Sequence, residues 1–145
     1  MLLYYFLNTN VHQSNSLRLL IGDTMVNIAV LVKQVPDTNS KIQIIGDRVD
    51  LSSVKMDISP YDEFAVENAL QHKDSSGGTV TAITLGGPGA DKVLKGVKAL
   101  GVDNIVRLDY DGFMDSNGLQ SVLANEISSG GYDVVYCGKS AADTG

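Results

Sequence analysis

The chain has 145 residues, which suits one domain with enough length to bury a hydrophobic core. Hydrophobic residues make up 43% and charged residues 19% of it, a balance that argues against intrinsic disorder. The net charge of −6, without a clustered basic patch, argues against a nucleic-acid-binding protein, and a single cysteine, Cys137, excludes an internal disulfide and a cysteine-rich metal site.

The first 24 residues differ from the rest of the chain. A short apolar start gives way to an Asn/Gln/Ser-rich stretch, which fits neither a signal peptide nor the roughly 20 apolar residues of a membrane span. We therefore expect residues 1–24 to be a poorly ordered extension that lies upstream of a true start at Met25. The single cysteine favours a reducing compartment, which we take to be the cytoplasm, or the mitochondrial matrix in a eukaryote.

The regular part of the chain begins with a strand and a hairpin. Val26–Val35 is apolar and β-branched and is followed by Pro36, which predicts a strand buried on both faces. The segments KIQII and RVDL flank Gly46-Asp47, which is typical of a tight hairpin turn.

A helix is predicted next, between Ser59 and Gly78. Ser59 suits the N-cap, Pro60 has the backbone angle required at the first helical position, and the acidic residues Asp62 and Glu63 suit the first turn.

Strands and helices then alternate to the end of the chain. Because strands that alternate with helices of about 10–15 residues form βαβ units, we predict an α/β fold with a parallel, Rossmann-like sheet and flanking helices. The predicted elements are a strand at Thr79–Leu85, a helix at Ala90–Leu100, a strand at Asn104–Leu108, a helix at Ser116–Ser128 and a strand at Tyr132–Cys137.

The loops that follow the strands are expected to form one binding site. Parallel sheets bind ligands beyond the carboxyl ends of their strands, near the point where the strand order reverses. The loops after the first strand, after Leu85 and after Cys137 are placed to meet there. The last loop, Gly138–Gly145, is rich in small residues that let backbone amides approach an anion.

The common glycine-rich nucleotide motifs are absent. A P-loop ending at Gly138–Ser140 would need a glycine at position 133, which is Asp133, and the turn at Gly87 lacks the last glycine of GxGxxG because Lys92 stands there. The stretch Ser129–Asp133 resembles a pyrophosphate loop, but it ends a helix and enters a strand, which is the wrong context.

Catalytic groups are also missing from the pattern. Cys137 lies on an apolar strand and is interpreted as a buried structural thiol, and no His, Asp or Glu pair has metal-ligand spacing. We therefore expect a binding or carrier protein without catalytic residues of its own.

Four stretches in this order resemble the β subunits of electron transfer flavoproteins. Their order and spacing agree with the family pattern throughout Val26 to Gly145, and although each alone is commonplace, the ordered set is specific. The stretches are Val32–Thr38 (VKQVPDT), Ile58–Leu70 (ISPYDEFAVENAL), Val80–Pro88 with Ala99–Asp103 (ALGVD), and Cys137–Asp143 (CGKSAAD).

The resemblance implies a fold similar to that of the adenine-nucleotide α-hydrolase group, an AMP site and a partner α subunit that holds most of a redox FAD. In electron-bifurcating relatives a second FAD takes the place of AMP. Carried over by position, Leu31 lies beside the adenine and Leu85 at the end of the second strand. The other implied cofactor-binding residues are Ser59, Pro60, Tyr61 and Asp62 around the nucleoside, and Gly138, Lys139, Ser140, Ala141, Ala142 and Asp143 around the phosphate.

The sequence departs from the family pattern at several positions. Ser140 and Ala142 stand where glutamine and isoleucine are usual, and Ser59 replaces an asparagine that also caps helices. The chain ends at Gly145, inside the phosphate loop, and lacks the later half of the family. We therefore expect residues 25–145 to be a nucleotide-binding domain that is incomplete at its C-terminus, and to bind nucleotide weakly.

The leading hypothesis is an electron carrier: the β subunit of a heterodimer that takes electrons from acyl-CoA-type dehydrogenases and passes them toward a quinone reductase. The alternative is a stand-alone adenine-nucleotide-binding module that resembles universal stress proteins and shares the βαβ layout. A hydrolase of the same fold group is a third possibility, which requires the pyrophosphate-type loop that is misplaced here.

Overall fold

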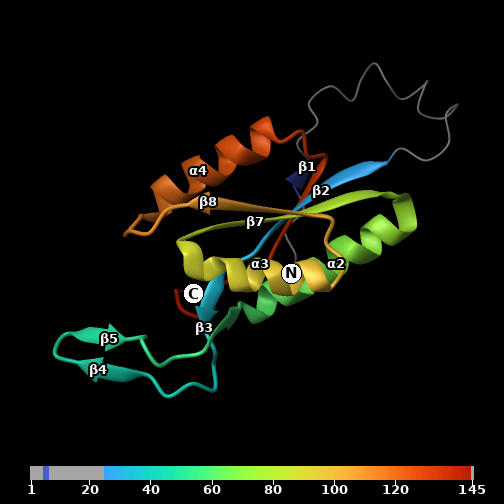
Figure 1. Cartoon of the computed structure of the whole chain (residues 1–145). Coiled ribbons are helices and arrows are strands. Elements are labelled where there is room, and N and C mark those ends of the chain that lie inside the picture. Colours follow the sequence, from blue (N-terminus) through green and yellow to red (C-terminus); the bar gives the residue numbers. More distant parts are fainter. Residues whose placement is uncertain (1–4, 7–24, 145) are drawn as a thin grey trace, which may run out of the picture.

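The computed structural model describes residues 5–6 and 25–144, and a parallel β-sheet forms its centre. The parallel strands are β2 (Val26–Leu31), β7 (Gly78–Gly86), β8 (Asn104–Asp109) and β9 (Val134–Cys137). A short strand β1 (Tyr5–Phe6) pairs antiparallel with β9, so the order is β1-β9-β2-β7-β8 (Figure 1). The predicted α/β fold of Rossmann-like type is confirmed, whereas most of the predicted extension, residues 1–4 and 7–24, lies outside the described residues.

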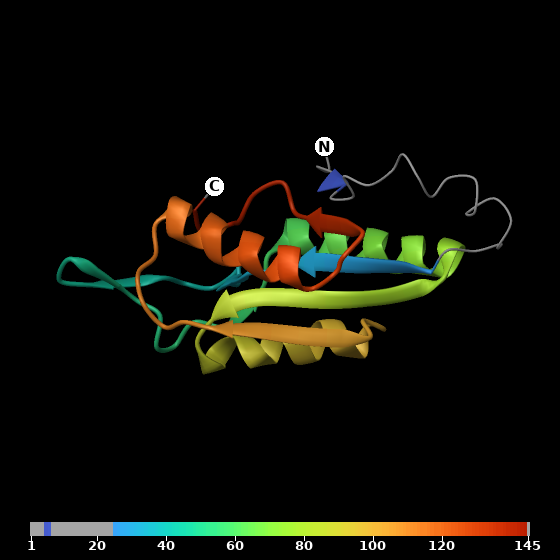
Figure 2. The same cartoon turned by 90° about the horizontal axis from the view of Figure 1, so that it is seen from above.

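Helices cover both faces of the sheet (Figures 1 and 2). Helix α2 (Pro60–Ser76) and helix α3 (Asp91–Ala99), which follows a short 3-10 turn at Pro88–Ala90, pack on one face. Helix α4 (Ser116–Ser129) packs on the other. Successive side chains of a strand point to opposite faces, so Ile28 and Val30 are buried under α2 and α3, whereas Ala29 is buried on the face of α4.

The strand order reverses beside β2. The chain runs from β2 to β7 and β8 in one direction, and then returns to place β9 on the opposite side of β2. Leu31, the last residue of β2, lies beside Ile83 of β7 and Cys137 of β9. Ligands of open α/β sheets bind at such a reversal, beyond the carboxyl ends of the strands.

The first predicted strand is two strands, and this part of the prediction was wrong. Strand β2 ends at Leu31, and a separate strand β3 (Gln34–Pro36) pairs antiparallel with β6 (Met56–Ile58), which the sequence pattern did not indicate. The main chain leaves the sheet because Lys33 donates its N–H to the Asp62 carboxylate at 2.8 Å and accepts the N–H of Ser59 at 3.0 Å.

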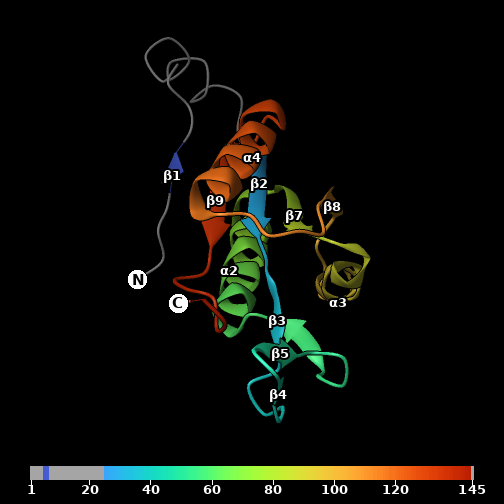
Figure 3. The same cartoon turned by 90° about the vertical axis from the view of Figure 1, so that its left-hand side faces the viewer.

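A hairpin projects beyond the carboxyl ends of the sheet strands (Figures 2 and 3). Its strands are β4 (Gln43–Ile45) and β5 (Arg48–Asp50). Gly46, in the turn between them, has a φ of 66°, a backbone conformation that glycine adopts without steric cost. Ile44 and Val49 pair directly across the hairpin and are 74% and 55% exposed. The predicted hairpin is therefore present, with an apolar pair open to solvent.

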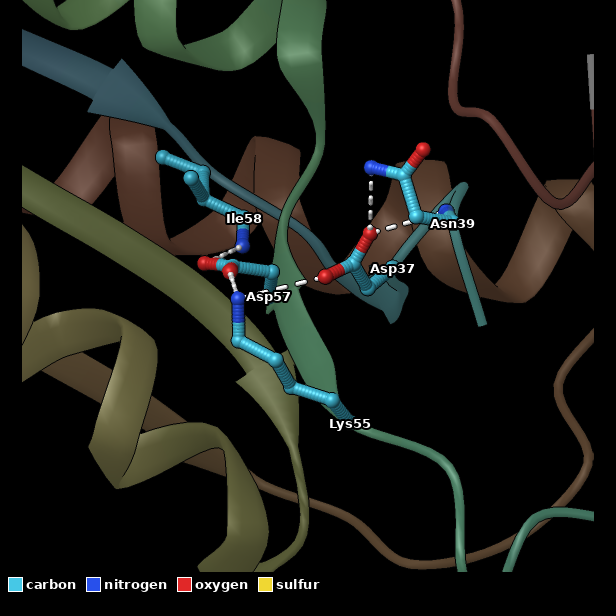
Figure 4. Close-up of polar contacts among 5 residues, drawn as sticks. All are labelled: Asp37, Asn39, Lys55, Asp57 and Ile58. Carbon is cyan, nitrogen blue, oxygen red and sulfur yellow. Dashed lines mark hydrogen bonds and ion pairs between the residues drawn. The ribbon is translucent and has the colours of Figure 1, made fainter. Parts of the chain in front are cut away.

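An ion-pair cluster joins the two ends of the segment that carries the hairpin (Figure 4). The Lys55 amine contacts Asp57 at 2.7 Å and Asp37 at 3.2 Å. Asp37 also accepts the Asn39 N–H, and Asp57 accepts the Ile58 N–H. The Asn39 N–H and Lys55 lower the pKa of Asp37, and Lys55 and the Ile58 N–H lower that of Asp57.

Helix α2 packs on the sheet through small and β-branched side chains. Ala65, Val66 and Ala69 are fully buried, whereas Phe64 is 65% exposed. The helix ends at Ser76, and the next residue, Gly77, has a φ of 73°, which favours glycine. The predicted span of this helix is confirmed.

Asp103 fastens the end of α2 to the sheet. Its carboxylate accepts the N–H of Val80 at 2.8 Å and contacts the amine of Lys73 at 2.7 Å. Partial burial acts to raise the pKa of Asp103, but the bonds from Lys73 and Val80 and the charge of Lys98 outweigh it and hold the pKa below its ordinary value of 3.8. The ionised carboxylate therefore stabilises the fold.

We expect Asp103→Asn to lower the free energy of unfolding by about 1 kcal/mol at neutral pH, because a charge-assisted hydrogen bond is lost. The folded-state pKa is depressed, so this contribution exists above pH 3.8 and disappears as the pH falls through the lower folded value. Urea unfolding followed by circular dichroism should therefore show that the free energies of unfolding of the wild type and Asp103→Asn become equal in acid. The control Asp74→Asn makes the same charge change at an exposed position and should unfold like the wild type; equal effects of both variants would contradict this role for Asp103.

Candidate functional site

A cavity of about 210 Å³ lies at the carboxyl ends of β2, β7 and β9. It occupies the strand-order reversal and opens between α4 on one side and the N-terminus of α2 on the other. Ligand pockets commonly measure about 300–1,000 Å³, so this cavity is sized for part of a nucleotide. Its lining residues are Leu31, Val32, Lys33, Asp62, Ile83, Thr84, Leu85, Leu119, Leu123, Cys137, Gly138, Ser140 and Ala141.

Asp62 joins the parts of the chain that surround the cavity. It lies in the first turn of α2, and its carboxylate accepts the Lys33 N–H at 2.8 Å and the Gly138 N–H at 3.2 Å. The two donors follow β2 and β9, which are neighbours in the sheet but more than a hundred residues apart in sequence. The loops after these strands are therefore fixed to one helix end.

Asp62 is only 8% exposed. Burial raises the pKa of its carboxyl above the ordinary value, against the two backbone donors and the charge of Lys33, which lower it. A position in the first turn of a helix favours the ionised form. Both oxygens are engaged with the protein backbone, so Asp62 organises the wall of the cavity.

Gly138 leaves no space for a side chain. A Cβ at this position would collide with the Asp62 carboxylate and would lie 2.9 Å from the carbonyl carbon of Tyr61. The close approach lets the loop after β9 lie directly against the N-terminus of α2. A helix N-terminus and exposed loop amides together favour an anionic ligand.

Further contacts link the loops around the cavity. The Lys33 amine contacts the Asp143 carboxylate at 2.7 Å and the Thr144 hydroxyl at 3.1 Å. Gln34 donates its side-chain amide to the carbonyl of Gly89, in the turn after β7, at 2.9 Å. The loops after β7 and β9 are thus each bonded to the loop after β2.

Half of the twelve predicted cofactor-binding residues line the cavity. They come from the end of β2, the start of α2, the end of β7 and the loop after β9. These residues are Leu31, Asp62, Leu85, Gly138, Ser140 and Ala141.

The other predicted residues lie beside the cavity. Ser59 is fully buried behind the loop after β9, and its hydroxyl donates to the Ser140 carbonyl at 3.5 Å. Ser59 occupies the N-cap position, and its carbonyl accepts the N–H groups of Asp62 and Glu63, but its hydroxyl makes no capping bond, so the predicted side-chain cap was wrong. The exposed residues of this set are Pro60, Tyr61, Lys139, Ala142 and Asp143.

Several lining residues were not predicted as part of the site. Thr84 and Ile83 precede Leu85 on β7, and they line the cavity because β7 extends past the end of β2. Leu119 and Leu123 lie four residues apart on α4, and this helical spacing could have indicated that they form one wall of the site. Val32 and Lys33 begin the motif VKQVPDT, directly after Leu31. They line the cavity because the chain leaves the sheet after β2.

Cys137 was interpreted as a buried structural thiol, but it is half-buried and lines the cavity. Burial and the neighbouring negative charge of Asp62 raise the pKa of its thiol. The thiolate, which is the nucleophilic form, is disfavoured there. Its environment suits packing at the end of β9 better than nucleophilic chemistry.

The match to known proteins agrees with this arrangement. Residues 48–145 match the model described as the electron transfer flavoprotein domain. The chain belongs to the electron transfer flavoprotein domain family. The resemblance to β subunits of these proteins, based on four stretches of sequence, is confirmed.

Relatives within this family carry related names. An electron transfer flavoprotein subunit beta from Bacillus subtilis is 34% identical over 123 residues, which cover 83% of this chain and 48% of the relative. An acryloyl-CoA reductase electron transfer subunit gamma from Anaerotignum propionicum is 34% identical over 124 residues, which cover 81% of this chain and 46% of the relative. The protein FixA of Azotobacter vinelandii is 31% identical over 121 residues, which cover 79% of this chain and 43% of the relative. The chain therefore spans about half the length of these curated relatives.

Two kinds of feature are absent from the described residues. No helix within them is long and apolar enough to cross a membrane. No cluster of three or more His, Cys, Asp or Glu side chains in the same part of the chain could bind a metal ion.

We expect Gly138→Ala to lower the free energy of unfolding by about 1–3 kcal/mol, the usual cost of an added methyl group in a packed site. The loop after β9 must move away from α2, which breaks the bond from the Gly138 N–H to Asp62. Urea unfolding measures the change. Gly96→Ala is the matched control: it lies in α3 with nothing near its added methyl, so it should stabilise by about 0.5–1 kcal/mol. A Gly138→Ala protein as stable as the wild type would contradict the close packing described here.

Proposed function

We propose that the chain is the nucleotide-binding front part of an electron transfer flavoprotein β subunit, which carries electrons as part of a heterodimer. The observation on which this rests is the match to the electron transfer flavoprotein domain over residues 48–145, together with a cavity at the strand-order reversal. Two relatives are named as electron transfer subunits, which fits a protein without catalytic residues of its own. A cytoplasmic location stays a prediction from the sequence.

AMP is the proposed ligand of the cavity. Leu31, Leu119 and Leu123 supply apolar surface suited to an adenine ring. Gly138 brings the loop after β9 close to the N-terminus of α2, where backbone amides favour a phosphate. When bound, AMP would serve structure and assembly, and a second FAD in its place would indicate an electron-bifurcating type.

An α subunit is the proposed partner, and it would hold most of the contacts to the redox FAD. Exposed apolar side chains support a protein partner, because such groups mark interaction surfaces. Phe64 on α2 and the pair Ile44 and Val49 on the projecting hairpin are all more than half exposed. Through the complete heterodimer we propose electron transfer from acyl-CoA-type dehydrogenases toward a quinone reductase.

Co-expression with an electron transfer flavoprotein α subunit tests the proposal. We expect an affinity tag on the chain to recover the α subunit together with FAD and AMP, detected chromatographically after heat denaturation. The control is the α subunit expressed with an untagged chain, which should not be retained. Recovery of the chain without the α subunit and without either nucleotide would contradict the proposal.

The alternative, a stand-alone module that resembles universal stress proteins, predicts a different oligomeric state and a different nucleotide preference. It predicts a homodimer that binds ATP in the absence of any α subunit. Calorimetric titration with AMP and ATP, combined with size-exclusion chromatography, separates the two. Preference for ATP by a dimer of this chain would favour the alternative.

A further inference from the structure

Lys33 and Asp143 form a charged pair at the mouth of the cavity. The Lys33 amine lies 2.7 Å from the Asp143 carboxylate and donates to the Thr144 hydroxyl at 3.1 Å. The side chains are 41% and 30% exposed, so solvent reaches both. Family resemblance had placed Asp143 around the phosphate, where its negative charge would repel a phosphate dianion.

Lys33 is the cationic side chain among the residues that line the cavity. The other charged lining residue, Asp62, directs both of its oxygens at backbone N–H groups. Lys139 belongs to the loop after β9, but it is exposed and does not line the cavity. An anionic group bound here would therefore meet the Lys33 amine as its positive partner.

The backbone of Lys33 is fixed while its side chain is free to change partner. Its N–H donates to Asp62 at 2.8 Å and its carbonyl accepts the Ser59 N–H at 3.0 Å. Only the flexible four-carbon side chain must rotate for the amine to leave Asp143. Exposed ion pairs contribute about 0–1 kcal/mol, so the pair with Asp143 opens at little cost.

We propose that Lys33 is the residue by which this site distinguishes a nucleoside monophosphate from a nucleoside, and that Asp143 is the internal competitor for its amine. A phosphate carries nearly two negative charges at neutral pH and outcompetes a single carboxylate for the amine. The inference rests on the nucleotide site proposed above and adds the origin of its phosphate preference. Asp143 thus acts as a counter-ion to Lys33, and phosphate contact falls to Lys33 and the loop amides.

Binding of AMP and of adenosine to the chain, measured by calorimetry at low salt, tests this assignment. We expect the wild type to prefer AMP. Lys33→Met should weaken AMP binding by roughly tenfold, the equivalent of one charge-assisted hydrogen bond, and leave adenosine binding unchanged. Asp143→Asn should strengthen AMP binding severalfold, because the amine no longer has a carboxylate partner, and again leave adenosine binding unchanged.

Two further variants serve as controls. Lys95→Met removes the same charge from an exposed position on α3 that does not line the cavity, and it should leave the preference for AMP intact. Lys33→Arg keeps the charge and should retain most of the preference. Added salt should reduce the preference in the wild type but hardly in Lys33→Met, because screening acts on the charge that this variant lacks.

The outcomes separate this assignment from the nucleotide site itself. If the wild type binds AMP and adenosine equally, the role of Lys33 is overturned while the nucleotide site stands. If Lys33→Met and Asp143→Asn both weaken AMP and adenosine alike, the pair only holds the loop in place and the assignment is also wrong. If the wild type binds neither compound, the nucleotide site and the role of Lys33 both fall.

Discussion

The carboxylate of Asp62 accepts backbone N–H groups from two loops that follow neighbouring strands of the sheet. These loops begin at Lys33 and at Gly138, and the carboxylate stands between them at the first turn of α2. A buried carboxylate is stable only when its oxygens are well paired, so the three segments must stay in register with one another. The cavity has a defined wall on this side because one charged side chain fixes all three.

The same constraint explains the irregular path of the chain after β2. An apolar, β-branched run from Val26 to Val35 would continue as one strand if local preference alone decided. The Lys33 N–H bonds to Asp62, and the chain leaves the sheet to form β3 and, after the hairpin, β6. The detour carries the Ile44–Val49 hairpin out beyond the strand ends (Figure 2).

Local patterns predicted the regular elements well, because their signals lie within each segment. The Gly46-Asp47 turn indicated the hairpin, and the Gly77-Gly78 pair indicated the end of α2. The break after Leu31 could not be predicted, since it depends on the bond from the Lys33 N–H to Asp62, which is distant in sequence. Strand β6 could not be predicted either, because it forms by pairing with β3, which exists only where the chain has left the sheet. At the site, strand ends and family motifs indicated six of the thirteen lining residues. The role of Ser59 was misjudged, because its hydroxyl faces the loop after β9 in the folded chain.

The central claim is that the loops after β2, β7 and β9 form one nucleotide site organised by Asp62. The most direct measurement is a titration of isotope-labelled chain with AMP, followed through the backbone amide signals in NMR spectra. We expect the amides of Lys33, Leu85 and Gly138 to shift together and saturate with one dissociation constant, while those of the distant Asp103 region stay unchanged. Signals that shift with different constants, that map to another face of the sheet, or that do not move at all would contradict the claim.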